Sequence, residues 1–425
     1  MSQLMKFKFK LFLLMVGLFV LPISLSSSAY AATVATSQPA IYAKAAIMVD
    51  ADTGQILYEK NVHQPMAIAS ISKLMTVYIV HQQIQSGKLH WDDRVKISPA
   101  VAKLSTASGL TNVPLKAGHS YSIRALVNAA LVVSANAAAI ALGQKVAASP
   151  QRFANKMTAT AKHLGIKDAK FYNAAGLTNK LTGSLALKHV AANAENLLSA
   201  KDVALLASRL ESSFPAVTKV TSRSQMTFAG KTYPGHNQLL GTNLGIKGAR
   251  VTGLKTGTSD EAGACFAGSA TYRGHRVVTV ILGARNNSAT DPARFIQTKK
   301  LLTTVLSKQT PIKIAKQSRI AGASEGRVPD GKQQTTRLVN QKTTWVWVPK
   351  GVTRQQIKGK YVKQPKKITA PEKKGKQVAT ANLVYDHHFM KYLNTFSKTV
   401  NLVTSKSIQK ANPFVLIWRA LTRLF

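Results

Sequence analysis

The sequence Ala69-Ser70-Ile71-Ser72-Lys73 stands at the front of a run, from Leu74 to Gln82, whose apolar pattern predicts a helix. A spacing of three residues places two side chains on the same face of a helix. The Ser70 hydroxyl and the Lys73 amine would therefore lie side by side, and the amine could take the hydroxyl proton. This stretch has the form of a nucleophile with its own base.

Ser-x-x-Lys alone is a weak signal, because about one or two such matches are expected by chance in a chain of 425 residues. A second match, from Ser407 to Lys410, indeed occurs near the C-terminus. A catalytic serine also needs a proton relay, an anchor for the substrate and donors for an oxyanion. The choice between the two matches depends on finding these companions.

The composition and the N-terminus indicate an exported protein. The chain has 58 Lys and Arg against 16 Asp and Glu, a net charge of +42, and such a surface attracts polyanions, of which nucleic acid is the usual one. Residues 1–31, however, have the pattern of a signal peptide: a basic start, an apolar run from Leu11 to Leu25, and Ala29-Tyr30-Ala31 as a cleavage site. An uncleaved anchor is the alternative, although the run is short for a bilayer span. We expect the outer face of the membrane or the cell wall of a Gram-positive envelope, with lipid head groups or wall polymers, and no nucleic acid, as the anionic partners.

The C-terminal tail, Pro413–Phe425, has the pattern of an amphipathic helix. Its apolar side chains gather on one side: Phe414, Ile417, Trp418, Ala420, Leu421, Leu424 and Phe425. Such a helix is too short to span a bilayer but can lie in its interface. The alternative is a terminal helix packed on the protein's own core. We assign residues 405–425 to a membrane-anchoring tail.

Between these ends the sequence predicts two domains. In residues 32–308, two strands around Ala45–Glu59 precede a helix-rich block from Ile123 to Leu210, and strands return over 253–284 before a closing helix. This order predicts an α+β fold, in which helices cover an antiparallel sheet. Residues 309–404 have short β runs separated by Pro and Gly and predict a small all-β domain, whose basic residues either face an anionic surface or simply contact solvent.

No cofactor and no metal are expected. The single cysteine, Cys265, excludes an internal disulfide and lies in an apolar strand-like run, where we expect it in the core. The ten histidines show no ligand spacing, and we expect His387-His388 to be a strand pair.

Two stretches supply the companions that Ser70 needs. Ser134-Ala135-Asn136 lies between two helical runs, where a hydroxyl and an amide could project from a loop into a cleft. Lys255-Thr256-Gly257-Thr258 lies on a predicted strand, where the amine and the hydroxyls can hold a carboxylate. A glycine there would let a substrate backbone approach the strand closely.

Together, Ser70-x-x-Lys73, Ser134-x-Asn136 and Lys255-Thr256-Gly257 resemble the three motifs of the penicillin-binding proteins and serine β-lactamases. Nearly all of the mature chain is similar to the low-molecular-mass D-alanyl-D-alanine carboxypeptidases, including the basic β domain and the amphipathic tail. Three positions depart from the family pattern. Many relatives have Ser-Gly-Asn-Asp where this chain has Ser134-Ala135-Asn136-Ala137, and Thr258 stands where histidine is common.

The resemblance implies a serine-type carboxypeptidase with a penicillin-binding fold. It would remove the terminal D-alanine from peptidoglycan stem peptides through an acyl-enzyme on Ser70, with Lys73 as an uncharged base and Ser134 as the proton relay, and β-lactams would acylate it. Backbone N–H groups of Ser70 and Thr258 would form the oxyanion hole. The resemblance further implies substrate binding by Asn136, Lys255, Thr256, Gly257, Thr258 and Arg294.

Three alternatives stay open at this point. A DD-endopeptidase or transpeptidase would share every catalytic residue. A β-lactamase would need a further base for deacylation, and Glu195 is the carboxylate loosely placed for that role. An inactive wall-binding protein that retains the motifs would form no covalent adduct with penicillin.

Overall fold

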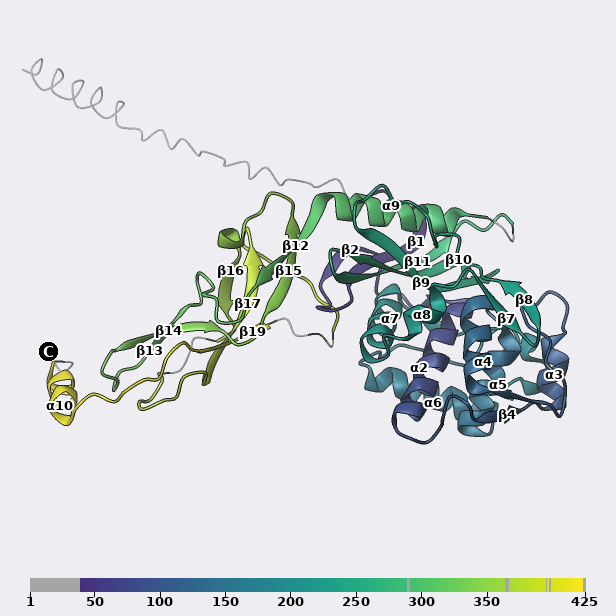
Figure 1. The fold of residues 1–425 in the computed structure, drawn as a ribbon, viewed down its shortest axis with the longest axis horizontal. Coiled ribbons are helices and arrows are strands. Elements are labelled where there is room, and N and C mark those ends of the chain that lie inside the picture. Colours follow the sequence, from purple (N-terminus) through teal and green to yellow (C-terminus); the bar gives the residue numbers. More distant parts are fainter. Residues whose placement is uncertain (1–38, 289–290, 364–366, 395, 397–398, 423–425) are drawn as a thin grey trace, which may run out of the picture. The chain divides into compact units, whose positions relative to one another are not determined.

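The computed structural model describes residues 39–425 except 289–290, 364–366, 395, 397–398 and 423–425 (Figure 1). The expected signal peptide lies outside the described residues. Antiparallel strands form a five-stranded sheet in the order β2-β1-β11-β10-β9, so that β9 is an edge strand. Their bounds are Ile56–Lys60 (β2), Ala43–Asp50 (β1), His275–Ala284 (β11), Gly263–Tyr272 (β10) and Ala249–Ser259 (β9).

Each face of the sheet has its own apolar core, because side chains alternate along a strand. In β1, Ala45 and Ile47 belong to one core, and Ala46 and Met48 to the other. The first core includes side chains of α7 (Ala200–Ser213), and the second includes those of α9 (Ala293–Lys308), the predicted closing helix. Helices therefore cover both faces of the antiparallel sheet, which confirms the predicted α+β fold.

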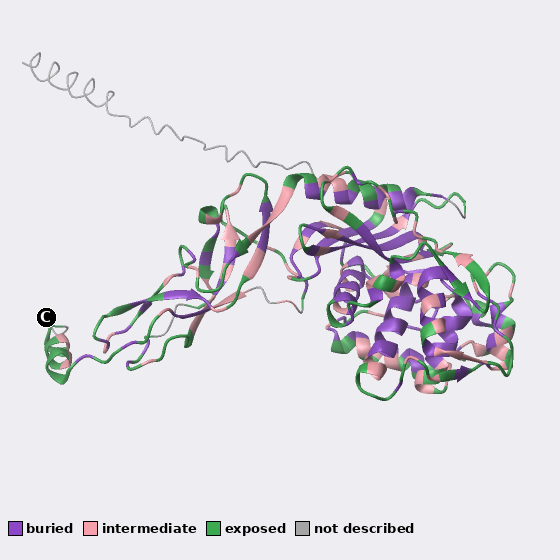
Figure 2. Ribbon diagram, viewed as in Figure 1, coloured by how far each residue is buried: buried purple, intermediate pink, exposed green. Residues whose placement is uncertain are grey.

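The helical block is built around α2 (Lys73–Gln85), which is buried from Lys73 to His81 (Figure 2). A helix buried on all sides is typical of the interior of a domain. The surrounding helices are α3 (Pro99–Ser105), α4 (Ile123–Asn128), the π-helix η2 (Ala129–Val133), α5 (Asn136–Ala147), α6 (Pro150–His163), η3 (Lys180–Leu185) and α8 (Val217–Thr221). Short strand pairs join β3 (Met66–Ala67) to β6 (Leu197–Leu198), β4 (Arg94–Lys96) to β5 (Ser120–Ser122), and β7 (Gln225–Phe228) to β8 (Lys231–Pro234).

The region after α9 is rich in strands and has its own apolar core, which includes Ile314, Leu338 and Leu402. Its larger sheet has the order β13-β14-β19-β17-β16, with β18 on β17, and β12 pairs with β15. The bounds are Gln309–Ile314 (β12), Glu325–Arg327 (β13), Thr335–Asn340 (β14), Thr344–Pro349 (β15), Arg354–Gln356 (η4), Lys358–Tyr361 (β16), Gln377–Tyr385 (β17), His388–Phe389 (β18) and Thr399–Thr404 (β19). The predicted strand pair His387-His388 is wrong, because His387 lies in the turn between β17 and β18 with φ 59°.

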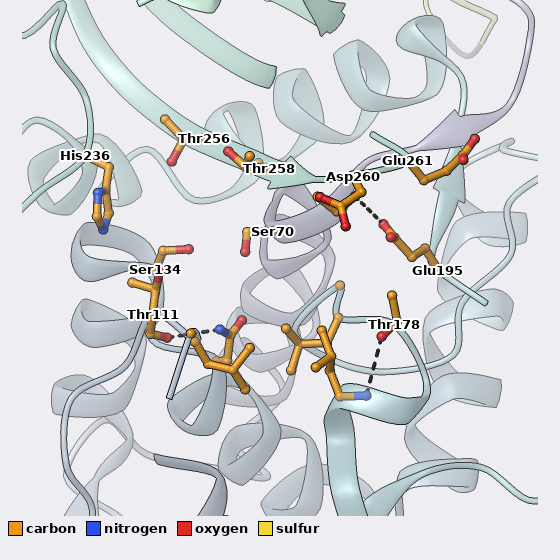
Figure 3. Close-up of a pocket in the computed structure, with 18 of the residues that line it drawn as sticks. Ser70, Thr111, Ser134, Thr178, Glu195, His236, Thr256, Thr258, Asp260 and Glu261 are labelled. Atoms are coloured by element: carbon orange, nitrogen blue, oxygen red, sulfur yellow. Dashed lines mark hydrogen bonds between the residues drawn. The ribbon is translucent and has the colours of Figure 1, made fainter. Parts of the chain in front are cut away.

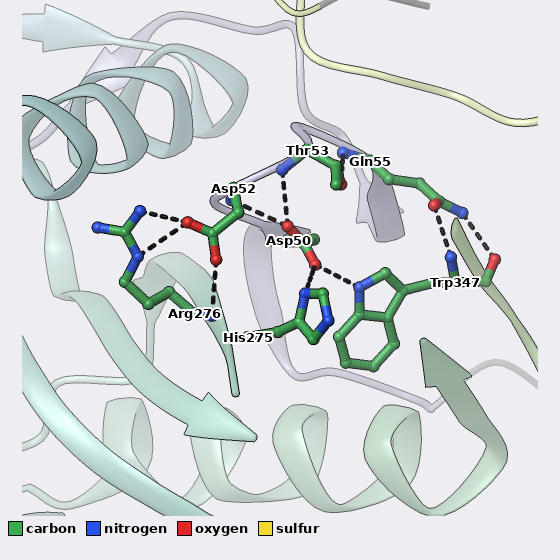
Figure 4. A network of polar contacts seen from close by, with 7 residues as sticks. All are labelled: Asp50, Asp52, Thr53, Gln55, His275, Arg276 and Trp347. Carbon is green, nitrogen blue, oxygen red and sulfur yellow. Dashed lines mark hydrogen bonds and ion pairs between the residues drawn. The ribbon is translucent and has the colours of Figure 1, made fainter. Parts of the chain in front are cut away.

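A buried polar network connects Trp347, on β15, to the end of β1 (Figure 4). Asp50 accepts a hydrogen bond from the Trp347 indole and lies 2.9 Å from Nδ1 of His275. Gln55 exchanges two hydrogen bonds of 2.8 Å with the backbone of Trp347. Burial acts to raise the pKa of Asp50, but hydrogen bonds from His275 and Trp347 hold it below its ordinary 3.8. The network therefore favours an ionised Asp50.

The last helix, α10 (Pro413–Leu421), begins at Asn412, whose side chain caps it by accepting from the N–H of Val415. None of its residues is buried, and Phe414 and Trp418 are 83% and 69% exposed. Arg419, on its other side, donates to the carbonyl of Gly331 at 2.8 Å. Within the described residues, every helix is too short or too polar to cross a membrane.

Candidate active site

Ser70 lies in a 3-10 turn, η1 (Ala69–Ser72), directly before α2. Ala69 has the left-handed φ of 43°, and the turn is closed by the Ile71 N–H donating to the Ile68 carbonyl at 3.1 Å. The Ser72 hydroxyl donates to the Ala69 carbonyl at 2.7 Å. These bonds fix the backbone that presents Ser70.

Two glycines allow the chain to pack against this turn. A Cβ on Gly176, which has φ +77°, would overlap the carbonyl oxygen of Ala69. A Cβ on Gly257 would stand 2.5 Å from the carbonyl oxygen of Ile68. We expected a glycine at position 257 because a substrate backbone would approach there. The structure gives a different reason: the backbone of the Ser70 turn fills the space that a Cβ on Gly257 would occupy.

Lys73 is fully buried beside Ser70. Its Nζ lies 2.7 Å from Ser70 Oγ, and it donates to Asn136 Oδ1 at 2.7 Å and to the Ala175 carbonyl at 2.9 Å. A neutral amine has two hydrogens and one lone pair. Since Asn136 Oδ1 and the Ala175 carbonyl can only accept, they use the two hydrogens, and the lone pair is left for the Ser70 hydroxyl to donate to.

The electrostatics favour the same protonation state. Burial, and then the nearby cation of Lys255, hold the pKa of Lys73 well below its ordinary 10.5. Both causes disfavour the charged ammonium. Ser70 and Lys73 therefore have the hydrogen bonding and the protonation states expected of a serine hydroxyl next to an uncharged base.

Ser134 and Asn136 come from the turn between η2 and α5. Ser134 is 5% exposed and has the left-handed φ of 66°, which directs the chain from one helix into the next. Asn136 contacts Lys73 through Oδ1 and donates to the Thr111 carbonyl through Nδ2 at 3.0 Å. Asn136 thus links Lys73 to the loop that follows α3 and contains Thr111.

Lys255, Thr256, Gly257 and Thr258 lie on the edge strand β9. Lys255 is 2% exposed and donates to the Thr256 carbonyl at 3.0 Å. Burial, and then Arg294, lower the pKa of Lys255 from 10.5 to about 7. Arg294, on α9, donates through Nη1 to the Gly257 carbonyl and to Thr258 Oγ1, both at 2.7 Å. Arg294 therefore fixes the end of the strand and contributes positive charge.

These residues surround a cleft of about 1000 Å³ (Figure 3). Five of the predicted site residues line it, in addition to Ser70 and Ser134: Asn136, Thr256, Gly257, Thr258 and Arg294. Lys73 and Lys255 are not among the lining residues and lie behind the wall. The structure thus brings all nine predicted residues to one place, with the two lysines shielded from the opening.

Two other residues at the cleft, His236 and Thr111, could not be predicted from the sequence. His236 precedes β9 and its Nε2 lies 3.0 Å from the carbonyl of Val133, the residue before Ser134. Loss of solvent around the ring, and then the positive charge of Lys255, lower the pKa of His236 and favour the neutral imidazole. Thr111, the backbone partner of Asn136, lies in the loop after α3. Neither belongs to a motif, and only the fold brings them here.

Glu195 also lines the cleft, from the loop between η3 and β6. It is 6% exposed, and its Oε2 accepts from the Ser259 hydroxyl at 2.8 Å. Two exposed carboxylates, Asp260 and Glu261, lie next to it and complete an acidic end of the cleft (Figure 3).

Two other predictions concern residues away from the cleft. Cys265 is fully buried, and burial raises the pKa of its thiol to about 11, so it is an unreactive core residue as expected. The competing match, Ser407, lies in the strand-rich region, where its hydroxyl accepts from the Lys374 backbone at 3.2 Å. It therefore has no place in the cleft.

Comparisons with known proteins agree with this arrangement. The family described as D-alanyl-D-alanine carboxypeptidase matches residues 32–286, and the family described as penicillin-binding protein 5, C-terminal domain, matches residues 310–410. D-alanyl-D-alanine carboxypeptidase DacC of Escherichia coli is 30% identical over 83% of this chain and 82% of its own length.

Solved structures give the same result. A peptidoglycan synthesis regulatory factor, PBP3, of Streptococcus pneumoniae superposes with a TM-score of 0.73 and 35% identity, over 87% of this chain and all of the other. Penicillin-binding protein D2 of Listeria monocytogenes, solved in an ampicillin-bound form, gives a TM-score of 0.52 and 33% identity over 62% of this chain and 98% of its own. The predicted family is confirmed: the chain belongs to the D-alanyl-D-alanine carboxypeptidases of the penicillin-binding type.

Proposed function

We propose that the protein is a serine-type D-Ala-D-Ala carboxypeptidase that removes the terminal D-alanine from peptidoglycan stem peptides through an acyl-enzyme on Ser70. The observation that carries this proposal is the contact of 2.7 Å between Ser70 Oγ and the buried Nζ of Lys73, at the edge of a cleft. A lone serine is a weak nucleophile, and an adjacent uncharged amine is the base that activates it.

In the first step Ser70 Oγ attacks the carbonyl carbon between the two D-alanines while Lys73 takes the hydroxyl proton. The proton then passes through Ser134 to the departing nitrogen. The bond from Ser70 to the carbonyl carbon forms, the amide C–N bond breaks, and D-alanine leaves with that proton. Asn136 holds Lys73 in place through the bond to its Oδ1.

The substrate is held at both ends of the scissile bond. Lys255, Thr256, Thr258 and Arg294 supply the positive charge and hydroxyls for the terminal carboxylate. Backbone N–H groups of Ser70 and Thr258 are the candidate oxyanion donors, a contribution of about 3 kcal/mol for each donor in other serine hydrolases. Water then attacks the acyl-enzyme and releases the shortened peptide.

Covalent labelling tests this mechanism. A fluorescent penicillin should label the wild-type protein, and Ser70→Ala should abolish the label, whereas Ser407→Ala should leave it intact. Absence of label on the wild type, which the inactive wall-binding alternative predicts, or a label that survives Ser70→Ala, would overturn the proposal.

The products separate the remaining alternatives. A carboxypeptidase releases D-alanine from a pentapeptide ending in D-Ala-D-Ala and forms no cross-linked product, whereas a transpeptidase joins peptides and an endopeptidase cleaves cross-links. A β-lactamase would release hydrolysed penicillin rapidly. In our account the penicilloyl adduct on Ser70 is long-lived.

We further propose that the protein is exported to the outer face of the cytoplasmic membrane of a Gram-positive cell, where α10 lies in the lipid interface. The exposed Phe414 and Trp418 on one side of α10 and the basic surface support this placement. A protein lacking residues 413–425 should no longer sediment with anionic vesicles, and wild-type binding should weaken as salt rises. Unchanged sedimentation of the shortened protein would contradict the anchoring role.

A further inference from the structure

The cleft has opposite charges at its two ends. Lys255 lies on β9, and Asp260 directly follows the last residue of that strand, Ser259, which is roughly 13 Å from Lys255 along an extended strand. In Figure 3, His236 and Ser134 lie on one side of Ser70, and Glu195, Asp260 and Glu261 lie on the other. Three of the 16 acidic residues in a chain of net charge +42 thus meet at one end of one cleft.

Glu195 is the informative member of this acidic end. It is 6% exposed, and only its Oε2 has a hydrogen-bond donor among the described residues, the Ser259 hydroxyl. Figure 3 shows its carboxylate directed into the cleft. The other oxygen is therefore left to accept a hydrogen bond from a ligand or water in the cleft.

The neighbouring carboxylates also favour a positively charged partner for Glu195. Burial raises its pKa, the Ser259 hydroxyl lowers it, and the carboxylates of Glu261 and Asp260 raise it further. A cation placed among the three carboxylates would relieve this repulsion. The acidic end is therefore suited to a positively charged group of the substrate.

The proposed reaction fixes which group that is. With the terminal carboxylate near Lys255 and the scissile carbonyl at Ser70, the part of the peptide that stays on the enzyme extends toward Ser259 and Asp260. The residue before the two D-alanines follows after one further extended step of about 3.5 Å. Its side chain is the first that can reach the carboxylates.

We propose that Glu195, Asp260 and Glu261 form a subsite for a side-chain amine on the residue that precedes D-Ala-D-Ala. The preferred substrate is then a stem peptide whose diamino acid at that position is not cross-linked. This inference rests on the proposed function and adds to it a preference between substrates. The enzyme would trim free stems and act slowly on stems whose amine has already been acylated in a cross-link.

Two peptides that differ only in this charge test the subsite: Nα-acetyl-L-Lys-D-Ala-D-Ala and its Nε-acetylated form. The wild-type ratio of kcat/KM for D-alanine release should favour the free amine by about fivefold, which corresponds to ~1 kcal/mol. The ratio should fall as salt rises, because an ion pair open to solvent is screened.

The isosteric changes Glu195→Gln, Asp260→Asn and Glu261→Gln, made singly and together, should bring this ratio close to one. In Glu195→Gln the new amide oxygen can still accept from Ser259, and the single changes at the exposed Asp260 and Glu261 avoid disturbing buried structure. Asp168→Asn, an exposed carboxylate outside the cleft lining, is the matched control and should keep the wild-type ratio.

The outcomes are distinct. If the wild type hydrolyses both peptides at equal rates, the proposed function holds and the subsite is overturned. If it hydrolyses neither, the proposed function fails and the subsite with it. If Glu195→Gln slows both peptides equally and leaves the ratio unchanged, Glu195 serves hydrolysis of the acyl-enzyme and the subsite is again overturned.

Discussion

Lys73 and Lys255 are two buried lysines whose charges influence each other, and the surrounding residues give them different protonation states. The pKa of Lys73 is held well below 10.5 by burial and then by Lys255. The pKa of Lys255 is lowered by burial and then by Arg294, to about 7. The hydrogen bonds of Lys73 and its lowered pKa both favour the neutral amine, whereas Lys255, with a pKa of about 7, still carries a partial positive charge near that pH.

This difference predicts the pH profile of the reaction. Activity should rise with pH while Lys73 loses its proton and fall above about pH 7 as Lys255 loses the positive charge that we propose attracts the substrate carboxylate. The fall in kcat/KM should approach tenfold per pH unit. In Lys255→Arg the guanidinium stays charged, so the alkaline fall should disappear. An identical alkaline fall in this variant would show that another group causes it.

Glu211, on α7, gives a prediction for stability. It is fully buried, neither of its carboxylate oxygens makes a hydrogen bond of normal geometry among the described residues, and the nearby Ser269 hydroxyl only partly offsets the effect of burial. Burial raises the pKa of Glu211 from 4.5 to about 7. Because the folded pKa is the higher one, this group's stabilising contribution is complete below pH 4.5 and is lost as pH rises through 7.

The loss amounts to about 3 kcal/mol in the free energy of unfolding. Glu211→Gln should remove this dependence, so that stability changes less between pH 5 and pH 8 than in the wild type, as measured by urea unfolding at both pH values. Glu325→Gln, an exposed glutamate in the strand-rich region, is the control and should keep the wild-type dependence. An unchanged dependence in Glu211→Gln would contradict the prediction.

At the scale of elements, the site depends on the close contact between the Ser70 turn and β9. In Gly257→Ala, the new methyl would meet the Ile68 carbonyl at 2.5 Å and push the strand away from η1. Such overpacking costs about 1–3 kcal/mol of stability. The rate of penicillin acylation should fall by at least tenfold in a protein whose circular dichroism is unchanged. Wild-type acylation in this variant would show that the contact does not position Ser70.

The elements of the catalytic region could be predicted from the sequence because their apolar periods are regular. The predicted strands around Ala45–Glu59 correspond to β1 and β2, and the predicted closing helix to α9. The three motifs also identified the residues that the structure brings together. The sequence predicted that something packs closely against Gly257, but not that it is the backbone of the Ser70 turn, because a glycine indicates close packing without identifying the neighbouring segment.

Other site residues could not be found in this way. His236, Thr111 and the carbonyl of Ala175 act through one contact each, and the partner lies far along the chain. Glu195 lies in a loop between η3 and β6, and its place in the cleft could not be read from its neighbours in the sequence. Such positions depend on tertiary packing, which leaves no local pattern.

For the whole molecule, the network around Asp50 predicts coupling between the catalytic sheet and β15. Trp347→Phe keeps the aromatic packing but removes the hydrogen bond to a fully buried carboxylate. The expected cost is about 1–3 kcal/mol in the free energy of unfolding, with penicillin labelling retained because Trp347 lies outside the cleft lining.

Trp345→Phe provides the comparison on the same strand. Its ring packs edge-on against His275 at 4.6 Å, and its indole makes no hydrogen bond to another described residue. This variant should lose less stability than Trp347→Phe in the same urea titration. Equal losses would indicate that ring packing, and not the bond to Asp50, joins these elements.

The proposed mechanism requires Lys73 to be an uncharged amine in a protein of net charge +42. The most direct measurement is an NMR titration of the lysine side-chain amines in protein labelled with ¹⁵N-lysine, with Lys73→Arg and Lys255→Arg to assign two resonances. We expect the resonance lost in Lys73→Arg to titrate well below the ordinary 10.5 and to belong to a neutral amine at pH 7. A Lys73 amine that stays protonated up to pH 10 could not serve as the base for Ser70.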